Sequence, residues 1–324
     1  MLSGTAQAKS GQKKILDGGQ KSKLHSILKH FKKDLPLTAI FLPCIVFYIL
    51  FRYGPMYGLL IAFKRYTPYR GIMGSEWVGL KYFIQFFSSP DFILLFKNTL
   101  LLGLFTLLCS FPFPILFALL LNEVRNQRFK KTVQTLSYLP SFFSIVVICS
   151  MVIDFLSPGH GMVNNVLAAL GLPRIYFLAK PEWFRTIYIV SDIWQATGFG
   201  AIIYLAAISG IDPQLYEASR MDGCSRLRSI WHITVPGIFP TIATMFILRS
   251  GGIMRIGFEK VLLLYNPTTY EVADVFSTFV YRKGMLEMSY SYAAAVGLFE
   301  SVVALFFVVL SNMISKRVSE HSLW

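Results

Sequence analysis

Six charged side chains lie within or beside long apolar runs of this sequence, where ionised groups are unusual. They are Asp154, Asp192, Arg249, Arg255, Glu259 and Glu300. A charged side chain near the centre of a lipid bilayer costs at least ~2.5–3.5 kcal/mol, so it needs a charged partner or contact with water. These residues can form ion pairs that hold a helix bundle together, or they can line a path for a polar solute. The sequence leaves both interpretations open.

The two arginines indicate what kind of solute such a path would favour. Arg249 and Arg255 are six positions apart, roughly 120° around an ideal helix, so they do not share one face. The Gly251-Gly252 pair between them can break the helix and turn both guanidinium groups toward a cavity, as at the discontinuous helices of transporters. Guanidinium groups bind carboxylates through two parallel hydrogen bonds, which favours an acidic solute. The other candidates to line the path are Asp192 and three aromatic residues with flat faces for a ring, Trp194, Tyr204 and Tyr281.

The motifs of common enzymes are missing from the sequence. It has no G-x-x-x-x-G-K-[ST] phosphate loop, so we expect no ATP hydrolysis by this chain. His160 and His232 stand apart from any cysteine or carboxylate cluster with metal-ligand spacing. No Gly-x-Ser-x-Gly turn is present, and the charged residues form no acid–base pair by spacing. We therefore expect no catalytic role, no metal and no cofactor in this chain.

The polar stretch 212–236 separates two very apolar segments. Its pattern predicts two short helices joined at a glycine: Asp212 caps the first helix, Pro213 occupies its first position, and Gly223 supplies the bend. Pro236 is expected to stop the second helix where the apolar sequence resumes. A bent helical hairpin at a membrane surface offers a rigid ridge without a catalytic group, which suits docking to a partner.

Composition places the chain in a membrane. Of 324 residues, 54% are hydrophobic and 15% charged, with a mean hydropathy of +0.55, whereas soluble domains carry about 25% charged residues. The apolar runs have the length that crosses a bilayer. They predict an all-α polytopic fold with six spans, at about 35–63, 92–121, 135–155, 184–207, 238–264 and 292–314. A polar tail, 1–34, precedes them without a cleavable signal peptide, and a short tail, 319–324, follows.

The basic residues predict which side of the membrane the loops face. With six spans, seventeen lysines and arginines fall on the side of the two termini and of stretch 212–236, against ten on the other side. This bias places both termini and the polar stretch in the cytoplasm. The lysine-rich tail then lies near lipid headgroups, and we expect no nucleic-acid partner. On the opposite side, Tyr66, Tyr69, Trp77 and Tyr82 are expected to form an interfacial aromatic belt, with direct ligand contact as the alternative.

Several segments carry a family resemblance. Glu217-Ala218-Ser219, Asp222-Gly223-Cys224, Ile233 and Val235-Pro236 resemble the EAA loop of ABC-importer permeases, usually E-A-A-x-x-D-G-A followed by I-x-L-P. Ser219, Cys224 and Val235 depart conservatively from that pattern. From about residue 35 onward, further segments are similar to the carbohydrate branch of type I importer permeases: Leu119–Glu123, Tyr138–Phe142, Ile203–Ala207, Leu264–Pro267 and Ser322–Trp324.

The resemblance implies a transmembrane domain of the maltose-importer kind in a bacterial cytoplasmic membrane. It implies as partners a second homologous permease, two ATPase subunits that hold ATP and magnesium, an extracytoplasmic solute-binding protein and membrane lipid. It assigns contact with the ATPase to nine residues, Tyr216, Glu217, Ala218, Ser219, Asp222, Gly223, Cys224, Ile233 and Pro236. The substrate would be an oligosaccharide, and the two arginines favour a uronate-containing one such as an alginate oligomer.

Two other classes of function are weighed against this one. An ion-coupled secondary sugar transporter would use Asp154, Asp192 and Glu300 as a proton relay, but it predicts inverted repeats, and no convincing repeat relates residues 35–160 to 180–318. A membrane-embedded enzyme would need a catalytic constellation that the sequence lacks.

Overall fold

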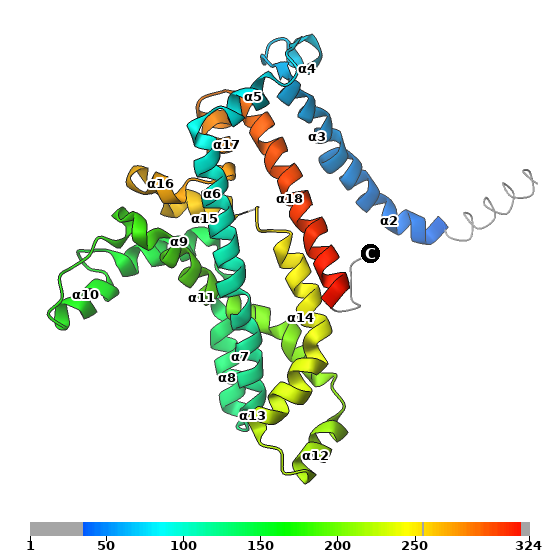
Figure 1. Cartoon of the computed structure of the whole chain (residues 1–324), viewed down its shortest axis with the longest axis vertical. Helices are drawn as coiled ribbons and strands as arrows, with labels where there is room; N and C mark the ends of the chain where they lie inside the picture. Colours follow the sequence, from blue (N-terminus) through cyan, green and yellow to red (C-terminus); the bar gives the residue numbers. More distant parts are fainter. Residues whose placement is uncertain (1–34, 255, 319–324) are drawn as a thin grey trace, which may run out of the picture. The chain divides into compact units, whose positions relative to one another are not determined.

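The computed structural model describes residues 35–254 and 256–318. The predicted tails 1–34 and 319–324 lie outside these described residues, and so does Arg255. The described chain falls into two compact units, which meet between residues 60 and 61. Both are helical, as the composition predicts, apart from one pair of two-residue strands in the second unit (Figure 1).

The first unit holds most of one apolar helical run. Its segments follow one another without a break and continue to Phe63: α2 (Leu35–Tyr48), the π-helical η1 (Ile49–Tyr53), α3 (Gly54–Met56) and the 3-10 helix η2 (Tyr57–Phe63). The predicted first span, 35–63, has the same end. Its apolar side chains between Ile40 and Tyr53 are largely exposed, as expected for a helix that meets lipid or another subunit.

The second unit begins with a small antiparallel hairpin, which pairs Lys64 with Trp77 and Arg65 with Glu76. Its elements up to the polar stretch are β1 (Lys64–Arg65), α4 (Gly71–Gly74), β2 (Glu76–Trp77), α5 (Lys81–Phe87), α6 (Pro90–Phe105), η3 (Thr106–Ser110), α7 (Pro112–Glu123), α8 (Gln127–Tyr138), η4 (Leu139–Phe142), α9 (Ile145–Leu156), α10 (Met162–Ala169), η5 (Phe177–Ala179) and α11 (Pro181–Ser209).

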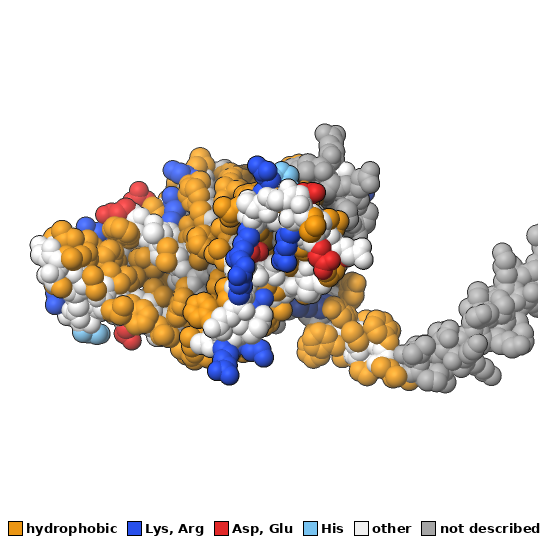
Figure 2. Space-filling model, turned by 90° about the horizontal axis from the view of Figure 1, so that it is seen from below, with side chains coloured by type: hydrophobic (Ala, Val, Ile, Leu, Met, Phe, Trp, Pro, Cys, Tyr) orange, Lys and Arg blue, Asp and Glu red, His pale blue; other side chains and the backbone are white. Residues whose placement is uncertain are grey.

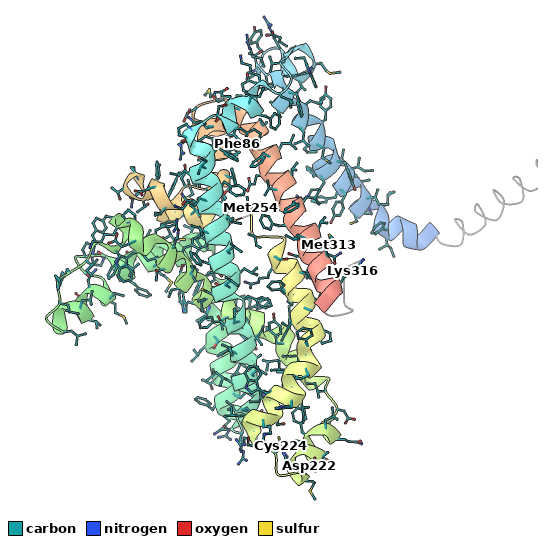
Figure 3. All side chains as sticks on the ribbon, viewed as in Figure 1. Phe86, Asp222, Cys224, Met254, Met313 and Lys316 are labelled. Carbon is teal, nitrogen blue, oxygen red and sulfur yellow. The ribbon has the colours of Figure 1, made fainter. Side chains whose placement is uncertain are left out.

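The remaining elements are α12 (Pro213–Met221), α13 (Arg226–Ser229), η6 (Ile230–Thr234), α14 (Val235–Ser250), α15 (Phe258–Leu264), η7 (Pro267–Thr269), α16 (Tyr270–Ala273), α17 (Phe276–Tyr281), η8 (Arg282–Leu286) and α18 (Tyr290–Val318). Within the second unit, Phe86 lies toward one end, and Asp222 and Cys224 lie at the other (Figure 3).

Among the described residues, five helical runs are long and apolar enough to cross a membrane, or six if one bent pair counts as a span. The predicted spans are thus present. The third is not the straight helix expected at 135–155, because residues 127–142 and 145–156 form two helices at 103°. Pro140 lies in the 3-10 turn that ends the first of them, and Ser144 caps the second by accepting a hydrogen bond from the amide of Val147 at 3.4 Å.

The fifth span also differs from its predicted range, 238–264. The helix begins earlier, at Arg226, and ends at Ser250, where Gly251 is the C-cap. Irregular backbone follows until α15 begins at Phe258. The break at Gly251-Gly252 that the sequence suggested is therefore present. Gly103 of α6 packs directly on it: a Cβ on Gly103 would lie 2.0 Å from the carbonyl oxygen of Ile253, so no larger residue fits there without movement.

Three prolines of the spanning helices closely follow π-helical segments. Three of the four π segments in the described residues, η1, η3 and η6, end two residues before a proline: Pro55, Pro112 and Pro236 respectively. A π segment widens the helix and changes which carbonyl each amide meets, so the missing proline N–H does not end the helix. The prediction that Pro236 stops the second helix of the polar stretch was wrong for this reason.

A buried polar network holds the segment between α15 and α18. Asp274 is almost fully buried and accepts hydrogen bonds from Thr278, at 2.7 Å, and from Arg282. The Asn98 amide of α6 donates to the backbone carbonyl oxygens of Glu271 and Asp274, at 3.0 and 3.2 Å. The network therefore fastens this segment to α6.

We expect Asp274→Ala to destabilise the chain by about 3–5 kcal/mol, because it leaves the Arg282 charge without its buried partner. The matched control is Arg65→Ala, which removes the exposed ion pair with Glu76 and should cost about 1 kcal/mol or less. Thermal unfolding of the purified complex measures both changes. Equal effects would contradict a structural role for the buried pair.

Candidate functional site

The polar stretch folds into the two predicted helices, α12 and α13. Asp212 caps α12: its Oδ1 accepts a hydrogen bond from the amide of Gln214 at 2.9 Å, and Pro213 occupies the first turn. Ser225 caps α13 by accepting from the amide of Arg228 at 3.4 Å. Both caps satisfy amides that the first turn of a helix leaves without partners.

The bend between the helices is a Schellman motif centred on Gly223. Its φ is +72°, in the left-handed region where glycine carries no steric penalty. The amide of Cys224 donates to the carbonyl of Ser219 at 2.9 Å, and the amide of Gly223 donates to the carbonyl of Arg220 at 3.1 Å. These bonds end α12 and fix the direction in which α13 leaves.

One side-chain contact ties α12 to the membrane helix. The hydroxyl groups of Tyr216 and Thr234 lie 3.0 Å apart, and Thr234 is buried in η6. Because η6 continues into α14 without a break, this contact joins α12 to the helix that ends at Ser250. A groove of about 830 Å³ separates α12 from the turn at 122–127.

The outer face of this hairpin is exposed. Glu217, Ala218, Asp222 and Gly223 are exposed, Tyr216, Ser219, Cys224 and Ile233 are half-buried, and Pro236 is exposed. Met221, at the end of α12, is 89% exposed. Figure 2, seen from this end of the molecule, shows blue lysine and arginine side chains gathered around the hairpin. The arginines on the hairpin and on the turn beside the groove, Arg220, Arg226, Arg228, Arg125 and Arg128, are all exposed.

A second site is the pocket at the break between α14 and α15, here called the membrane pocket, of about 530 Å³. It brings together two of the predicted path residues, Asp192 of α11 and Arg249 of α14. Gln195, Glu259 and Lys260 also line it. The structure thus brings together two predicted path residues that are 57 positions apart in the chain, and their role in a solute path stays a prediction.

Lys260 is a charged group of the pocket that the sequence analysis did not single out. Its side chain is 5% exposed, and its Nζ lies 3.8 Å from Asp192 Oδ1 and 4.5 Å from the centre of the Tyr188 ring. That nitrogen makes no hydrogen bond, and the same holds for Asp192 Oδ2. Lys260 is one of the ten basic residues that the charge count placed on the side opposite the termini, and it lies directly before the apolar Val261–Leu264.

The other predicted path residues lie elsewhere. Tyr204 is 4% exposed and packs in a core cluster with Ala118, Ala201 and Ile238, so neither face of its ring is open to a solute here. Trp194 is partly exposed but does not line the pocket. The Tyr281 ring lies 5.2 Å from that of Phe258, which does line it. Arg255 lies outside the described residues.

The described residues contain no group of three or more His, Cys, Asp or Glu side chains that could hold a metal ion. The described residues thus present an exposed helical hairpin at one end of the second unit and a pocket with charged lining elsewhere in it.

Comparison with known proteins identifies the class. The family model for the binding-protein-dependent transport system inner membrane component matches residues 110–320. The chain belongs to this family, whose members are membrane-spanning transport subunits. The resemblance to ABC-importer permeases is thereby confirmed, and the family decides against an ion-coupled secondary transporter.

Individual relatives are similar over nearly the whole chain. The polygalacturonan/rhamnogalacturonan transport system permease YteP of Bacillus subtilis is 46% identical over 305 residues, covering 94% of this chain and 95% of the relative. The protein LplB of the same organism is 43% identical over 293 residues, covering 90% and 92%.

A solved structure of a bacterial ABC transporter that imports the acidic polysaccharide alginate contains a chain 48% identical to this one. Its TM-score is 0.84, and the match covers 90% of this chain and 99% of that one. A second structure of an alginate transporter, in complex with an alginate pentasaccharide-bound periplasmic protein, matches with a TM-score of 0.85 and 47% identity over 91% and 99%.

Proposed function

We propose that this chain is one of two permease subunits of an ATP-driven importer for uronate-containing oligosaccharides, among which alginate oligomers are our specific candidate. One observation carries the substrate class. The relatives at 46% and 48% identity serve polymers with different names, polygalacturonan/rhamnogalacturonan and alginate, and these polymers share acidic sugar units. A carboxylate on the sugar ring is therefore the common chemical feature.

The membrane pocket supports an acidic solute. Its volume of about 530 Å³ lies within the range of small-molecule sites, roughly 300–1,000 Å³. Lys260 is compensated by Asp192, whereas Arg249 has no ion-pair partner among the described side chains and is exposed. Its guanidinium group is free to hold a carboxylate with two hydrogen bonds.

The hairpin of α12 and α13 is the proposed contact with an ATPase subunit in the cytoplasm. Its exposed ridge carries Glu217 and Ala218, and its basic surroundings agree with a cytoplasmic position for this end and for both termini. The complete importer would add a second permease, two ATPase copies that bind ATP and magnesium, and a solute-binding protein on the other side. The binding-protein complex of the alginate transporter supports the last of these.

The substrate class is tested by uptake into liposomes that contain the complete importer, with ATP inside and the binding protein outside. We expect saturable, ATP-dependent uptake of trigalacturonate or trimannuronate. Uptake of neutral galactotriose alone, or uptake of the acidic sugars driven by a proton gradient without the ATPase, would contradict the proposal.

We expect Glu217→Lys to uncouple ATP hydrolysis from uptake, because it reverses the charge on the exposed ridge of α12 while leaving the core untouched. Uptake should fall about tenfold or more, which corresponds to a loss of about 1.4 kcal/mol or more of binding free energy between the hairpin and the ATPase subunit. The control is Gln214→Lys, which adds a positive charge at an exposed position earlier on the same helix. Equal losses in both variants would show that the charge of the hairpin matters, but not Glu217 itself.

A further inference from the structure

The geometry points to a second sugar-binding site at the end of the second unit opposite α12, a pocket that holds one pyranose ring. We call it the tyrosine pocket, because Tyr66, Tyr82, Tyr290 and Tyr292 line it. Its volume is about 420 Å³. The inference rests on the proposed function for the solute class and for the placement of this end outside the cell.

Three separate parts of the chain build its walls. Tyr66 follows β1, Tyr82 lies on α5, and Tyr290 and Tyr292 lie in the first turn of α18. Helices α5 and α17 both pack against α18 (Figure 1). The rings of Tyr66 and Tyr290 meet edge to face, with centres 5.9 Å apart and planes at 83°. Aromatic side chains from distant segments therefore converge on one hollow.

The remaining lining is polar and suits hydroxyl groups. Gln85, Lys283, Ser289 and Ser291 supply hydrogen-bond donors and acceptors beside the tyrosine hydroxyls. Lys283 Nζ lies 2.7 Å from Glu287 Oε2, so its charge is already compensated. The pocket thus offers a mainly polar lining in which the lysine is already paired with Glu287, and this fits the hydroxyls of a sugar rather than its carboxylate.

The pocket is held in shape before any ligand arrives. The amide of Tyr66 donates to Ser291 Oγ at 3.0 Å, which joins the hairpin to α18. The amide of Ser289 donates to the carbonyl of Lys283 at 2.8 Å. Between them Met288 adopts a φ of 55°, a left-handed conformation that a non-glycine residue rarely takes. A preformed site loses less entropy when it binds a ligand.

The pocket divides the four aromatic residues for which the sequence favoured an interfacial belt over ligand contact. Tyr69 and Trp77 are 79% and 60% exposed and do not line the pocket, as expected for an interfacial belt. Tyr66 and Tyr82 are half-buried and do line it. A belt requires no enclosed space, whereas a ligand site does.

The test measures whether sugars protect the pocket from a chemical label. Gln85→Cys, on α5, places a thiol in the lining, and Tyr69→Cys, in the turn before α4, is the control outside it. The complex of both permeases and both ATPase subunits, with the binding protein left out, is treated with a membrane-impermeant maleimide. Peptide-resolved mass spectrometry then distinguishes the new thiol from the native cysteines. We expect both galactotriose and trigalacturonate to slow labelling at position 85 several-fold and to leave position 69 unchanged. Tetraethylene glycol should protect neither.

Absent or equal protection at the two positions, or no labelling of position 85 without sugar, would overturn the inference. Protection by trigalacturonate alone would overturn the assignment to ring hydroxyls. Uptake provides an independent measurement. Tyr82→Ala should raise the KM of uptake roughly tenfold, which corresponds to the loss of one contact of moderate strength, and should leave kcat unchanged. Tyr69→Ala should change neither KM nor kcat. Because galactotriose reports on the pocket without any acidic substrate, failure of the proposed substrate class remains distinguishable from failure of this site.

Discussion

Replacing Gly223 with proline is expected to reduce uptake roughly 100-fold while the importer still assembles. Proline cannot adopt the observed φ of +72°, and it lacks the amide hydrogen that binds the carbonyl of Arg220. A proline that conflicts with the backbone in this way costs about 3 kcal/mol locally, which corresponds to about two powers of ten in an equilibrium. The cost falls on the joint between α12 and α13 and not on the packed helices.

Gly171→Pro is a control with matched local damage. Gly171 ends α10 with a φ of +74°, and the amides of Gly171 and Leu172 bind the carbonyls of Ala168 and Leu167 in the same Schellman pattern. This turn belongs to the loop between α9 and α11, away from the proposed ATPase contact. We expect Gly171→Pro to retain coupled uptake.

Liposome uptake and ATP hydrolysis measured on the same preparation distinguish the two variants, with gel filtration as the check of assembly. A coupled Gly223→Pro importer would contradict the assignment of the bend. A Gly171→Pro importer that fails equally would show that any such break in the fold is sufficient, so the loss would say nothing specific about the hairpin.

Arg249→Gln is expected to lower the uptake of acidic sugars far more than that of neutral ones. Glutamine keeps a hydrogen-bonding side chain at the edge of the membrane pocket but removes the charge and the paired donors of arginine. A charge-assisted hydrogen bond contributes about 1.5–3 kcal/mol, so kcat/KM for trigalacturonate should fall roughly 10- to 100-fold. If galactotriose is transported, its kcat/KM should change little.

Arg249→Lys provides the graded comparison. It retains a positive charge but not the planar pair of donors, so its effect on trigalacturonate should lie between those of wild type and Arg249→Gln. Equal losses for acidic and neutral sugars in Arg249→Gln would remove this side chain from the recognition of carboxylates. They would leave the sugar class to be explained by the partner subunit or the binding protein.

Local signals in the sequence predicted the hairpin well. Asp212, Pro213 and Gly223 each act on backbone within a few residues, and so the cap, the helix start and the bend follow from side-chain chemistry alone. The break at Gly251-Gly252 was predictable for the same reason. The ATPase contact assigned to these residues stays a prediction.

Features that depend on distant parts of the chain were harder to predict. The buried charge of Lys260 is compensated by Asp192, which lies in another helix. No sequence spacing links the two residues. The tyrosine pocket needs residues from the hairpin, α5 and α18 at once. The effect of Pro236 was misjudged because a π segment directly upstream, η6, changes the hydrogen bonding of the helix.

The proposed function requires contact between the α12–α13 hairpin and an ATPase subunit. Photocrosslinking in the assembled importer tests this contact directly. Met221 lies at the exposed end of α12, and a cysteine placed there by Met221→Cys is labelled with a benzophenone maleimide. We predict a crosslink to the ATPase subunit that changes in yield when ATP is added, and none from Met73→Cys in α4 at the other end. Labelling of Met221→Cys from outside intact cells, or the absence of any crosslink to the ATPase, would contradict the account.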